Sequence, residues 1–581
     1  MKRFIIKNLP RYIFGGIFLL VSTGLDIWFP IITMNIIDEV LVGGDMGRLW
    51  PNLACILTVG FGRALSQYIK EYNCDMAGCN VAEDLRKDLM GHMQTLSKSF
   101  FDENNTGELM ARVRDDAGKV WDMVGFIGML ITEAACYFLG VVVLMLKLNW
   151  KLALIPLAFM PPLGFIVMKL NRKLDGLYGQ ISEENASLNR VIEENISGVR
   201  TVKAFVAEDY EMDKFDKKNE KYNALNIEQG NYMANVEPVI NTIPKIMQAL
   251  VILAGGYAAV NGKITIGTLA AFMQYSNNIV WPIENMGWML NCMNAGVASL
   301  KKINKIYAAK PVITECEHPV ELAETKGTLS FDHVSFSIND KEILNDVSFE
   351  ILQGKTLGIM GETGSGKSMI VNLVERFYDV TKGSIRINDV DIRSMKLKDV
   401  RSFSSVVTQD VFLFSDTIKE NVKLGEKEHM KDDTVRYALR KAHAHEFVEK
   451  ITGGFDAVIG ERGIGLSGGQ KQRLSIARAL ARNAGVLIMD DSTSALDMET
   501  ESDIQREINA KKDMSKIIIG HRISSVKDAD EIIVLDKGKI AERGTHTSLL
   551  EKKGLYYSTY EAQYGSYKLA MKALGGEASG N

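Results

Sequence analysis

Phosphate-binding chemistry is indicated by the stretch GETGSGKS, Gly361–Ser368, which matches the P-loop pattern GxxxxGK[ST]. Its glycines let successive backbone N–H groups wrap a phosphate, and the helix expected to begin near Lys367 directs its positive end at the same anion. The Lys367 ammonium can reach the β- and γ-phosphates, and the Ser368 hydroxyl can bind Mg²⁺. An apolar strand pattern precedes the motif and a helical pattern follows it. The predicted nucleotide contacts are Gly361, Glu362, Thr363, Gly364, Ser365, Gly366, Lys367, Ser368 and Met369.

A second apolar run, VLIMD, ends in Asp490 and is followed at once by Asp491. A carboxylate at the end of a buried strand beside a P-loop is the usual residue that orients Mg²⁺. We assign this role to Asp490.

A third motif, LSGGQ at Leu466–Gln470, stands immediately before an amphipathic helical pattern rich in Arg and Lys. One interpretation is a capped helix start, with Ser467 as the cap and the glycines forming the turn. The other is a second phosphate-binding helix N-terminus that faces a different nucleotide, which a head-to-tail partner chain would supply. The residue pattern alone leaves both open.

These motifs occur together in an order that resembles the nucleotide-binding domain of ATP-binding cassette (ABC) proteins. After the P-loop come Gln409 in SSVVTQDVFLF, then LSGGQ, the strand to Asp490, SALD ending in Asp497, and His521 in IIIGHRIS. AVIGERG, just before LSGGQ, resembles the corresponding loop of exporters. In the first half of the chain, FFDENNTGELMARVRDD, ENISGVRTVKAFVAED and ITIGTLAAFMQY resemble exporter-type half-transporters. The resemblance covers nearly the whole chain.

The resemblance implies a dimer in which each ATP lies between the P-loop of one chain and the signature of the other, formed by Leu466, Ser467, Gly468, Gly469 and Gln470. It implies that Gln409 senses the γ-phosphate and Mg²⁺, that His521 contacts the γ-phosphate, and that Asp497 communicates across the dimer. Mg²⁺ would be held by Ser368, Gln409 and Asp490. The segments Glu108–Asp116 and Lys203–Tyr210 would be the coupling helices that press on the cassettes.

Two positions depart from the family pattern. Ile338 stands where the family usually has an aromatic residue that stacks on adenine, and Asp491 stands where the family usually has the Glu that polarises the attacking water. The shorter Asp491 side chain draws the carboxylate back by about one C–C bond, and a misplacement of ~1 Å can cost about a hundredfold in rate. Asp491 is therefore either a slow but working catalytic residue or part of a degenerate site in a heterodimer. The intact LSGGQ fits the second interpretation because it would complete the partner's catalytic site.

The first 300 or so residues differ in composition from the rest and contain six apolar runs that could cross a membrane. A helix needs about 20 mainly apolar residues to span the hydrocarbon core. The six predicted spans are Tyr12–Ile36, Trp50–Ile69, Val124–Leu146, Leu152–Met168, Pro238–Val260 and Thr268–Met293. Basic residues before the first span and in the two long connections place the N-terminus and those connections in the cytoplasm. Six scattered cysteines imply no disulfide framework.

Charged and amide side chains within the spans are costly in hydrocarbon and should face protein or a watery cavity. These residues are Asp26, Arg63, Glu133, Lys245, Glu284 and Asn291. For each, a substrate pathway and interhelical pairing remain equal alternatives. Taken together, the six favour a polar cavity.

The predicted fold is an N-terminal all-α transmembrane domain of six helices, of the type I exporter fold, followed by a C-terminal α/β P-loop ABC nucleotide-binding domain. We place the transmembrane domain at residues 1–310, a linker at 311–326, the nucleotide-binding domain at 327–565 and a flexible tail at 566–581. A formal net charge of −4 does not indicate nucleic-acid binding, which usually requires a basic surface.

The predicted function is ATP-driven export of amphipathic small molecules, drugs or lipids, across the bacterial cytoplasmic membrane, by one half of a heterodimer. The expected cofactors are ATP and Mg²⁺, and the expected partners are a second ABC half-transporter chain, membrane lipids and the exported molecule. The alternatives are a homodimeric lipid flippase or peptide exporter with slow ATPase activity, and an ATP-gated switch that transports nothing.

Overall fold

The computed structural model describes residues 1–565 except 323, 325, 427–428 and 494. It divides into two compact units. The helical unit comprises Met1–Thr95 and Asn104–Ala309, and the α/β unit comprises Leu96–Glu103 and the chain from Lys310 onward. The main division thus falls at Ala309, next to the predicted boundary at 310. The predicted tail, 566–581, lies outside the described residues.

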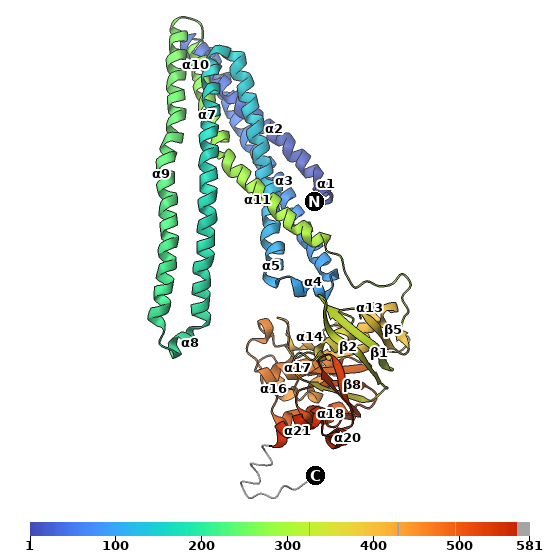
Figure 1. Cartoon of the computed structure of the whole chain (residues 1–581). Helices are drawn as coiled ribbons and strands as arrows, with labels where there is room; N and C mark the ends of the chain where they lie inside the picture. The colour runs from blue at the N-terminus through green and yellow to red at the C-terminus, as the bar shows by residue number, and fades with distance from the viewer. Residues whose placement is uncertain (323, 325, 427–428, 494, 566–581) are drawn as a thin grey trace. The chain divides into compact units, whose positions relative to one another are not determined.

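Long helices build the helical unit, because apolar runs in a membrane must satisfy every backbone N–H and C=O within the segment. Figure 1 shows α7 and α9 running alongside each other, with α8 at their shared end. The helices are α1 (Lys2–Lys7), α2 (Leu9–Asn35), α3 (Leu49–Thr95), α5 (Thr106–Ala111), α6 (Ala117–Asp122), α7 (Gly128–Ser197), α8 (Val199–Ala204), α9 (Glu208–Val260), α10 (Ile266–Asn278) and α11 (Val280–Ala308). Short π-helical turns, η3 (Arg112–Asp116) and η4 (Met123–Ile127), join α5, α6 and α7.

The helix α7 contains two of the predicted spans, separated by a kink at Asn149, whose φ is −159° and ψ 105°. The Asn149 side-chain oxygen accepts a hydrogen bond from the backbone N–H of Leu152 at 3.1 Å, so it caps the second half of the helix. By length and composition, three helical stretches of the described chain could cross a membrane: Leu9–Val42, Thr106–Ser197 and Glu208–Val260. The predicted spans at Trp50–Ile69 and Thr268–Met293 lie on the more polar helices α3 and α10–α11.

Several intramembrane polar residues pair with one another inside the helical unit. The Arg63 Nε lies 2.5 Å from Asp26 Oδ1, and Lys70, whose side chain is 2% exposed, forms an ion pair with Glu133. Asn291 Nδ2 donates to Asp175 Oδ1 at 2.6 Å. Interhelical pairing is therefore the correct interpretation for Asp26, Arg63, Glu133 and Asn291. For Lys245 and Glu284 both interpretations stay open.

Two sheets form the framework of the α/β unit. A four-stranded antiparallel sheet has the order β2-β1-β4-β5, and a six-stranded sheet has the order β10-β9-β3-β8-β7-β6, in which only β10 runs antiparallel to its neighbour. The strands are β1 (Leu329–Ile338), β2 (Lys341–Ile351), β3 (Thr356–Gly361), β4 (Lys382–Ile387), β5 (Val390–Asp391), β6 (Ser404–Val407), β7 (Val486–Asp490), β8 (Ser515–Ile519), β9 (Glu531–Asp536) and β10 (Lys539–Gly544).

The parallel strands are buried along nearly their whole length, which explains why they read as continuous apolar runs in the sequence. Their helices are α12 (Lys367–Val374), α13 (Leu397–Phe403), α14 (Ile418–Val422), α15 (Asp432–Lys441), α16 (His445–Lys450), α17 (Gly468–Ala481), α18 (Met498–Ala510), α19 (Ile523–Val526), α20 (His546–Lys552) and α21 (Leu555–Tyr560). One apolar core lies between the two sheets and α12, and a second includes α15, α17 and α18. Parallel strands end at one edge of the sheet, so loops from different motifs meet there.

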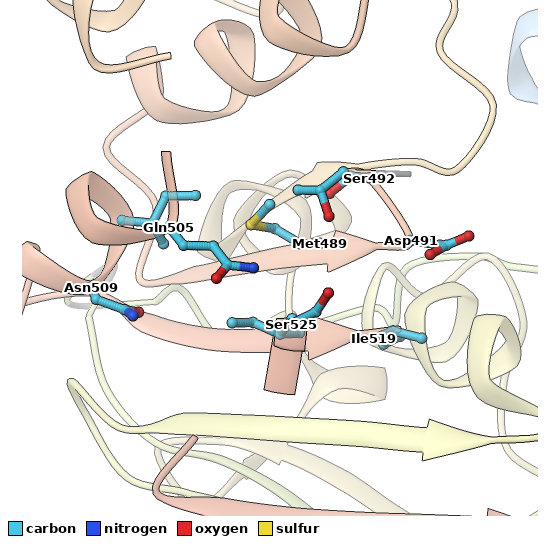
Figure 2. Close-up of a pocket in the computed structure, with 10 residues that line it drawn as sticks. Met489, Asp491, Ser492, Gln505, Asn509, Ile519 and Ser525 are labelled. Carbon is cyan, nitrogen blue, oxygen red and sulfur yellow. The ribbon is translucent and has the colours of Figure 1, made fainter. Parts of the chain in front are cut away.

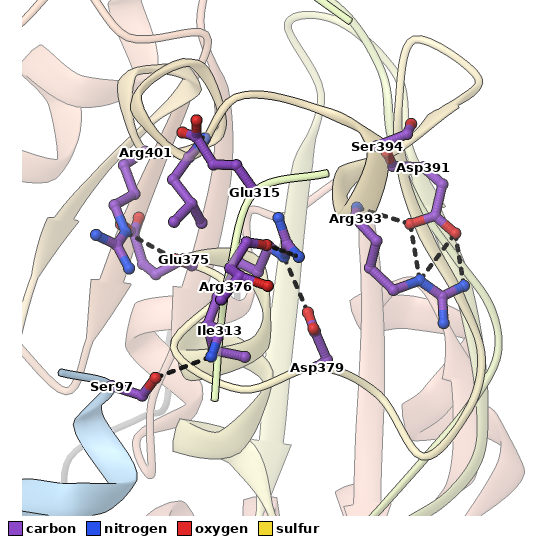
Figure 3. A network of polar contacts seen from close by, with 12 residues as sticks. Ser97, Ile313, Glu315, Glu375, Arg376, Asp379, Asp391, Arg393, Ser394 and Arg401 are labelled. Atoms are coloured by element: carbon purple, nitrogen blue, oxygen red, sulfur yellow. Dashed lines mark hydrogen bonds and ion pairs between the residues drawn. The ribbon is translucent and has the colours of Figure 1, made fainter. Parts of the chain in front are cut away.

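The segment Leu96–Glu103, which includes α4 (Lys98–Glu103), groups with the α/β unit although it follows α3 in sequence. Ser97 Oγ accepts hydrogen bonds from the backbone N–H groups of Val312 and Ile313, each at 2.9 Å (Figure 3). Asp102 accepts a hydrogen bond from the Tyr378 hydroxyl. This segment is therefore held to the rest of the α/β unit by a side chain near each of its ends.

The predicted coupling segment Glu108–Asp116 lies in the helical unit, and its coupling role stays a prediction. Arg112 Nη1 lies 2.7 Å from Asp116 Oδ2, and Ser299 Oγ donates to Asp116 Oδ1 at 2.6 Å. Arg112 and Asp116 thus have their partners inside the helical unit. The second predicted segment, Lys203–Tyr210, joins α8 to α9 and stays a prediction.

Candidate nucleotide site

The motifs that the sequence spreads over 160 or so residues meet at the carboxyl edge of the six-stranded sheet. The P-loop follows β3, Gln409 follows β6, Asp490 ends β7 and His521 follows β8. Together they line a cavity of about 300 Å³. Its lining comprises Thr363, Gly364, Gly366, Lys367, Ser368, Met369, Gln409, Asp490, Asp491 and His521, with Ile343 and Ile519 as apolar neighbours. The structure thus brings most of the predicted nucleotide residues to one place.

Two P-loop glycines hold backbone conformations that a side chain would disturb. Gly361 has φ +151° and Gly366 has φ +101°. A Cβ at Gly361 would lie 2.3 Å from the Leu535 carbonyl oxygen, and a Cβ at Gly366 would lie 2.7 Å from Leu344 Cδ2. The loop can therefore keep its backbone N–H groups close to a phosphate only with glycine at these positions.

Lys367 is held by the loop itself. Its side chain is buried, and its Nζ donates to the carbonyl oxygens of Gly361 at 2.7 Å and Glu362 at 2.8 Å. Burial lowers the pKa of Lys367, and the nearby charges of Asp490 and Asp491 oppose this effect. Phosphate oxygens offer stronger, charge-assisted bonds than neutral carbonyls, so an incoming triphosphate can take over this ammonium.

The oxygen donors near Lys367 suit Mg²⁺. Burial raises the pKa of Asp490, whereas a hydrogen bond from Ser368 and the charges of Lys367 and His521 lower it. Ser368, Gln409 and Asp490 offer only hydroxyl, amide and carboxylate oxygens. Mg²⁺ usually takes one or two protein carboxylates together with substrate phosphates and waters. The described residues contain no group of three or more His, Cys, Asp and Glu that could hold a metal ion.

Asp491 lies at the end of β7 beside the neighbouring strand β8. Its backbone N–H donates to the Ile519 carbonyl at 2.9 Å, and its φ is +43°. Figure 2 shows Asp491 at the tip of β7, with Ile519 at the tip of the adjacent strand. Aspartate enters this left-handed region more readily than most residues. The Asp491 carboxylate is thus mounted on a fixed, locally strained turn, and its catalytic role stays a prediction.

Sequence reasoning missed Glu501, a buried carboxylate behind this turn. Glu501 Oε1 accepts from Thr493 Oγ1 at 2.7 Å and from Ser525 Oγ at 3.3 Å, and Glu501 Oε2 lies 3.5 Å from Arg522 Nη1. It therefore ties the segment after Asp491 to the segment after His521 (Figure 2 labels Ser525). The signal was its spacing: Glu501 shares the buried face of α18 with Ile504 and Ile508.

The LSGGQ motif forms a helix cap. Gln470 N donates to Ser467 Oγ at 3.3 Å, and Ser467 N donates to Gln470 Oε1 at 2.9 Å, a reciprocal capping box at the start of α17. A Cβ at Gly469 would lie 3.1 Å from the Ala495 carbonyl oxygen, so this turn is tight. The capping interpretation is correct, and a second role toward a partner's nucleotide stays a prediction.

Two other predicted residues lie away from the cavity lining. Asp497 caps α18, accepting from Thr500 N at 2.9 Å, and this hydrogen bond lowers the pKa of Asp497. Ile338 is half-buried at the end of β1, opposite Lys341, and packs against the core between the sheets. Of the described residues, it is Ile343 rather than Ile338 that lines the cavity from this hairpin. The adenine contact of Ile338 stays a prediction.

Comparisons with known proteins agree with this geometry. Residues 12–283 match the family model described as ABC transporter transmembrane region, and residues 344–494 match the model described as ABC transporter. A "Putative multidrug export ATP-binding/permease protein" of Staphylococcus aureus (strain NCTC 8325 / PS 47) is 33% identical over 583 residues, or 97% of this chain and 100% of that protein. The chain belongs to the ABC exporter family.

Two further known proteins are similar to this ABC exporter over nearly its whole length. An "ATP-dependent lipid A-core flippase" of Desulfotalea psychrophila (strain LSv54 / DSM 12343) is 33% identical, covering 91% of this exporter and 92% of its own length. The solved structure of a bacterial Atm1-family ABC exporter with ATP bound matches with a TM-score of 0.77 and 25% identity, covering 97% of this chain and 98% of that chain. The exporter is thus a transport ATPase and a multi-pass membrane protein with a cytoplasmic ATP-binding domain.

Proposed function

We propose that this ABC exporter is one half of a heterodimer that moves amphipathic small molecules out across the bacterial cytoplasmic membrane. ABC exporters work as dimers, and this chain carries one membrane half and one ATPase half. The multidrug and flippase names of its relatives support an amphipathic substrate. The observation that carries the heterodimer is Asp491, which lines the nucleotide cavity with a side chain one methylene shorter than the usual glutamate.

In the proposed cycle, ATP binds between the P-loop of this chain and the LSGGQ motif of its partner. Lys367 exchanges two loop carbonyls for phosphate oxygens, and His521 donates to the γ-phosphate. Ser368, Gln409 and Asp490 would hold Mg²⁺, which when bound neutralises phosphate charge. ATP binding closes the two ATPase domains and turns the membrane cavity outward, and hydrolysis resets it.

In this cycle, Asp491 limits the rate of hydrolysis at this chain's own P-loop site. Its carboxylate is drawn back from the water by about one C–C bond, and such a misplacement costs on the order of a hundredfold in rate. We infer that this P-loop site binds ATP and hydrolyses it slowly. The LSGGQ motif of this chain would complete the faster site, in which the partner supplies the glutamate.

The experiment that tests this function is uptake into inverted membrane vesicles that contain the complex purified from its own cells. We expect ATP-dependent, saturable uptake of an amphipathic dye that is lost in Lys367→Ala and retained in Lys398→Ala, an exposed lysine elsewhere in the α/β unit. A second, different ABC chain should co-purify. No saturable uptake of any amphipathic dye or lipid would contradict export.

A homodimeric lipid flippase is the second candidate, because a relative at 33% identity carries a flippase name. It predicts that only copies of this chain co-purify. It also predicts that changing Asp491 removes most of the ATP turnover, since both sites then depend on it. Either result would reject the heterodimer.

A further inference from the structure

The chain just after His521 begins a short helix, α19, that does not cap itself. Its N-cap residue is Arg522, whose side chain makes no cap hydrogen bond. The Gln563 amide, 40 residues beyond Ile523, takes that place. Gln563 Oε1 accepts from the backbone N–H of Ile523 at 2.9 Å, and Gln563 Nε2 donates to the carbonyl oxygen of His521 at 2.6 Å. One side chain thus holds the backbone on both sides of Arg522.

The element that carries Gln563 is itself anchored. Gln563 lies in η8 (Glu561–Gly565), which continues α21. Three tyrosines of this stretch pack in or against the same apolar core as Ile523 of α19. These are Tyr556, Tyr560 and Tyr564. Glu542 Oε2 also accepts from the backbone N–H of Tyr556 at 3.1 Å, at the start of α21. The Gln563 amide is therefore presented to the backbone after His521 from a fixed support.

The two hydrogen bonds of Gln563 restrain the backbone of His521 as well as satisfying it. Water could satisfy the His521 carbonyl, because His521 and Gln563 are both exposed. A water molecule is free to leave, however, whereas an amide on an anchored helix keeps its two partners in place. On the other side of His521, the Gly520 N–H donates to the Ile359 carbonyl of β3 at 3.2 Å. The backbone of His521 is thus held between the sheet and Gln563.

Of the described residues, His521 lines the nucleotide cavity and Gln563 does not. We propose that Gln563 is a positioning residue that holds the His521 imidazole in place to donate to the γ-phosphate. This inference rests on the γ-phosphate contact in the proposed function and adds the residue that positions it. A donor held in place loses less conformational freedom when the triphosphate binds, so binding is tighter. ADP has no γ-phosphate, so its binding should not depend on Gln563.

The test compares AMP-PNP with ADP as competitors of azido-ATP photolabelling of this chain, in the purified complex on ice. AMP-PNP keeps a γ-phosphate and is not hydrolysed, so the result depends neither on turnover nor on transport. Gln563→Met keeps the length of the side chain and loses both hydrogen bonds. We expect it to weaken AMP-PNP binding about three- to tenfold and ADP binding less than about twofold.

The matched control is Gln353→Met, the same chemical change at an exposed position of the α/β unit. Gln353 precedes β3, whereas the P-loop follows it, so this residue lies at the opposite end of the strand from the nucleotide. Binding of both nucleotides should be unchanged in this variant.

A double-mutant cycle separates positioning from a general loss of structure. His521→Ala alone should weaken AMP-PNP binding about 10- to 100-fold, because a hydrogen bond to a charged group is lost. If Gln563 acts through His521, adding Gln563→Met to His521→Ala should change AMP-PNP binding by less than about twofold. A merely structural role would weaken the binding of both nucleotides, and would do so in either background.

The proposal is overturned if Gln563→Met weakens AMP-PNP and ADP equally, leaves AMP-PNP binding within about twofold of the natural protein, or keeps its full effect beside His521→Ala. If Gln563→Met does not assemble, Gln563→Asn is measured, which draws the amide back by about one C–C bond. Unchanged AMP-PNP binding would then overturn the proposal. No effect of His521→Ala would remove the γ-phosphate contact and this inference with it. Failed vesicle uptake would reject export without changing these affinities.

Discussion

The α/β unit and the helical unit use polar residues in opposite ways. In the α/β unit, charges from distant motifs converge on one cavity because four neighbouring strands end at the same sheet edge. In the helical unit, several charges pair between helices, as in Lys70 with Glu133. The contrast teaches that the residues of the nucleotide cavity are encoded in short motifs, whereas the partners of charges in the helical unit depend on how its helices pack.

Breaking a buried pair in the helical unit should give the largest effect. Lys70→Met leaves the Glu133 carboxylate without its partner, and the loss of one member of a buried pair costs about 3–5 kcal/mol. The double variant Lys70→Met, Glu133→Leu should recover most of that stability because no unpaired charge remains. Thermal unfolding of the complex in nanodiscs measures both. Equal destabilisation by the single and double variants would mean that the pair is not what holds these helices.

Replacing a buried carboxylate in the α/β unit should raise stability, whereas replacing Lys70 should lower it. Burial raises the pKa of Glu375 from 4.5 to about 7, against a hydrogen bond from Ser404 and the charges of Arg482 and Arg401. The raised pKa means that the stability from the protonated form is complete below pH 4.5 and is lost as the pH rises through 7. Figure 3 shows Glu375 among the polar contacts of this unit.

Glu375→Gln stays neutral at every pH and keeps an acceptor for Ser404. We expect the variant to gain up to about 3 kcal/mol of stability over the natural protein at pH 8, and close to none at pH 4.5. Calorimetry of the α/β unit's transition at the two pH values measures the difference. A gain of the same size at both values would show that ionisation of Glu375 is not responsible.

Lys367→Ala tests the nucleotide site of the α/β unit. Removing an ammonium that binds phosphate costs about 1.5–3 kcal/mol per charged hydrogen bond, or about 10- to 100-fold in affinity. Photolabelling of this chain with an azido-ATP measures its occupancy. Labelling equal to that of the natural chain would mean that Lys367 does not bind the triphosphate.

Glu501→Gln should have a smaller effect than Lys367→Ala. The amide keeps a hydrogen-bond acceptor for Thr493 and Ser525 but loses the charge that faces Arg522, a change of about 1 kcal/mol. We expect thermal unfolding to show a loss of about that size in the stability of the α/β unit while ATP binding holds, because Glu501 positions other residues and does not line the cavity. Glu499→Gln is the matched control, one exposed glutamate on the same helix. Equal effects from both would reject a positioning role.

The meeting of the P-loop, Gln409, Asp490 and His521 around one cavity could be predicted, because each follows or ends an apolar strand and parallel strands place their ends together. It could not predict Ile343 or Glu501, since an apolar residue on a hairpin and an acid on an amphipathic helix look ordinary outside the fold. In the helical unit, spans were predictable from hydropathy. The partners of Asp26 and Glu133 were not, because rotation of one helix about its axis decides which side chains meet.

The contacts of Gln563 escaped sequence reasoning for a similar reason. Gln563 lies 40 residues beyond Ile523, outside every family motif. Only the packing of η8 beside α19 brings its amide to the backbone of His521 and Ile523. The placement of Leu96–Glu103 in the α/β unit likewise depends on tertiary contacts, such as Ser97 with Ile313.

The most direct test of the heterodimer proposal is ATP turnover of the co-purified complex carrying Asp491→Asn. If this chain's site is degenerate, turnover should stay within about twofold of the natural complex, because the partner's glutamate carries the reaction. Changing that glutamate to glutamine should remove about 99% of turnover, the hundredfold expected for a misplaced catalytic group. A tenfold or greater loss from Asp491→Asn alone would contradict the proposal and make Asp491 a working catalytic residue.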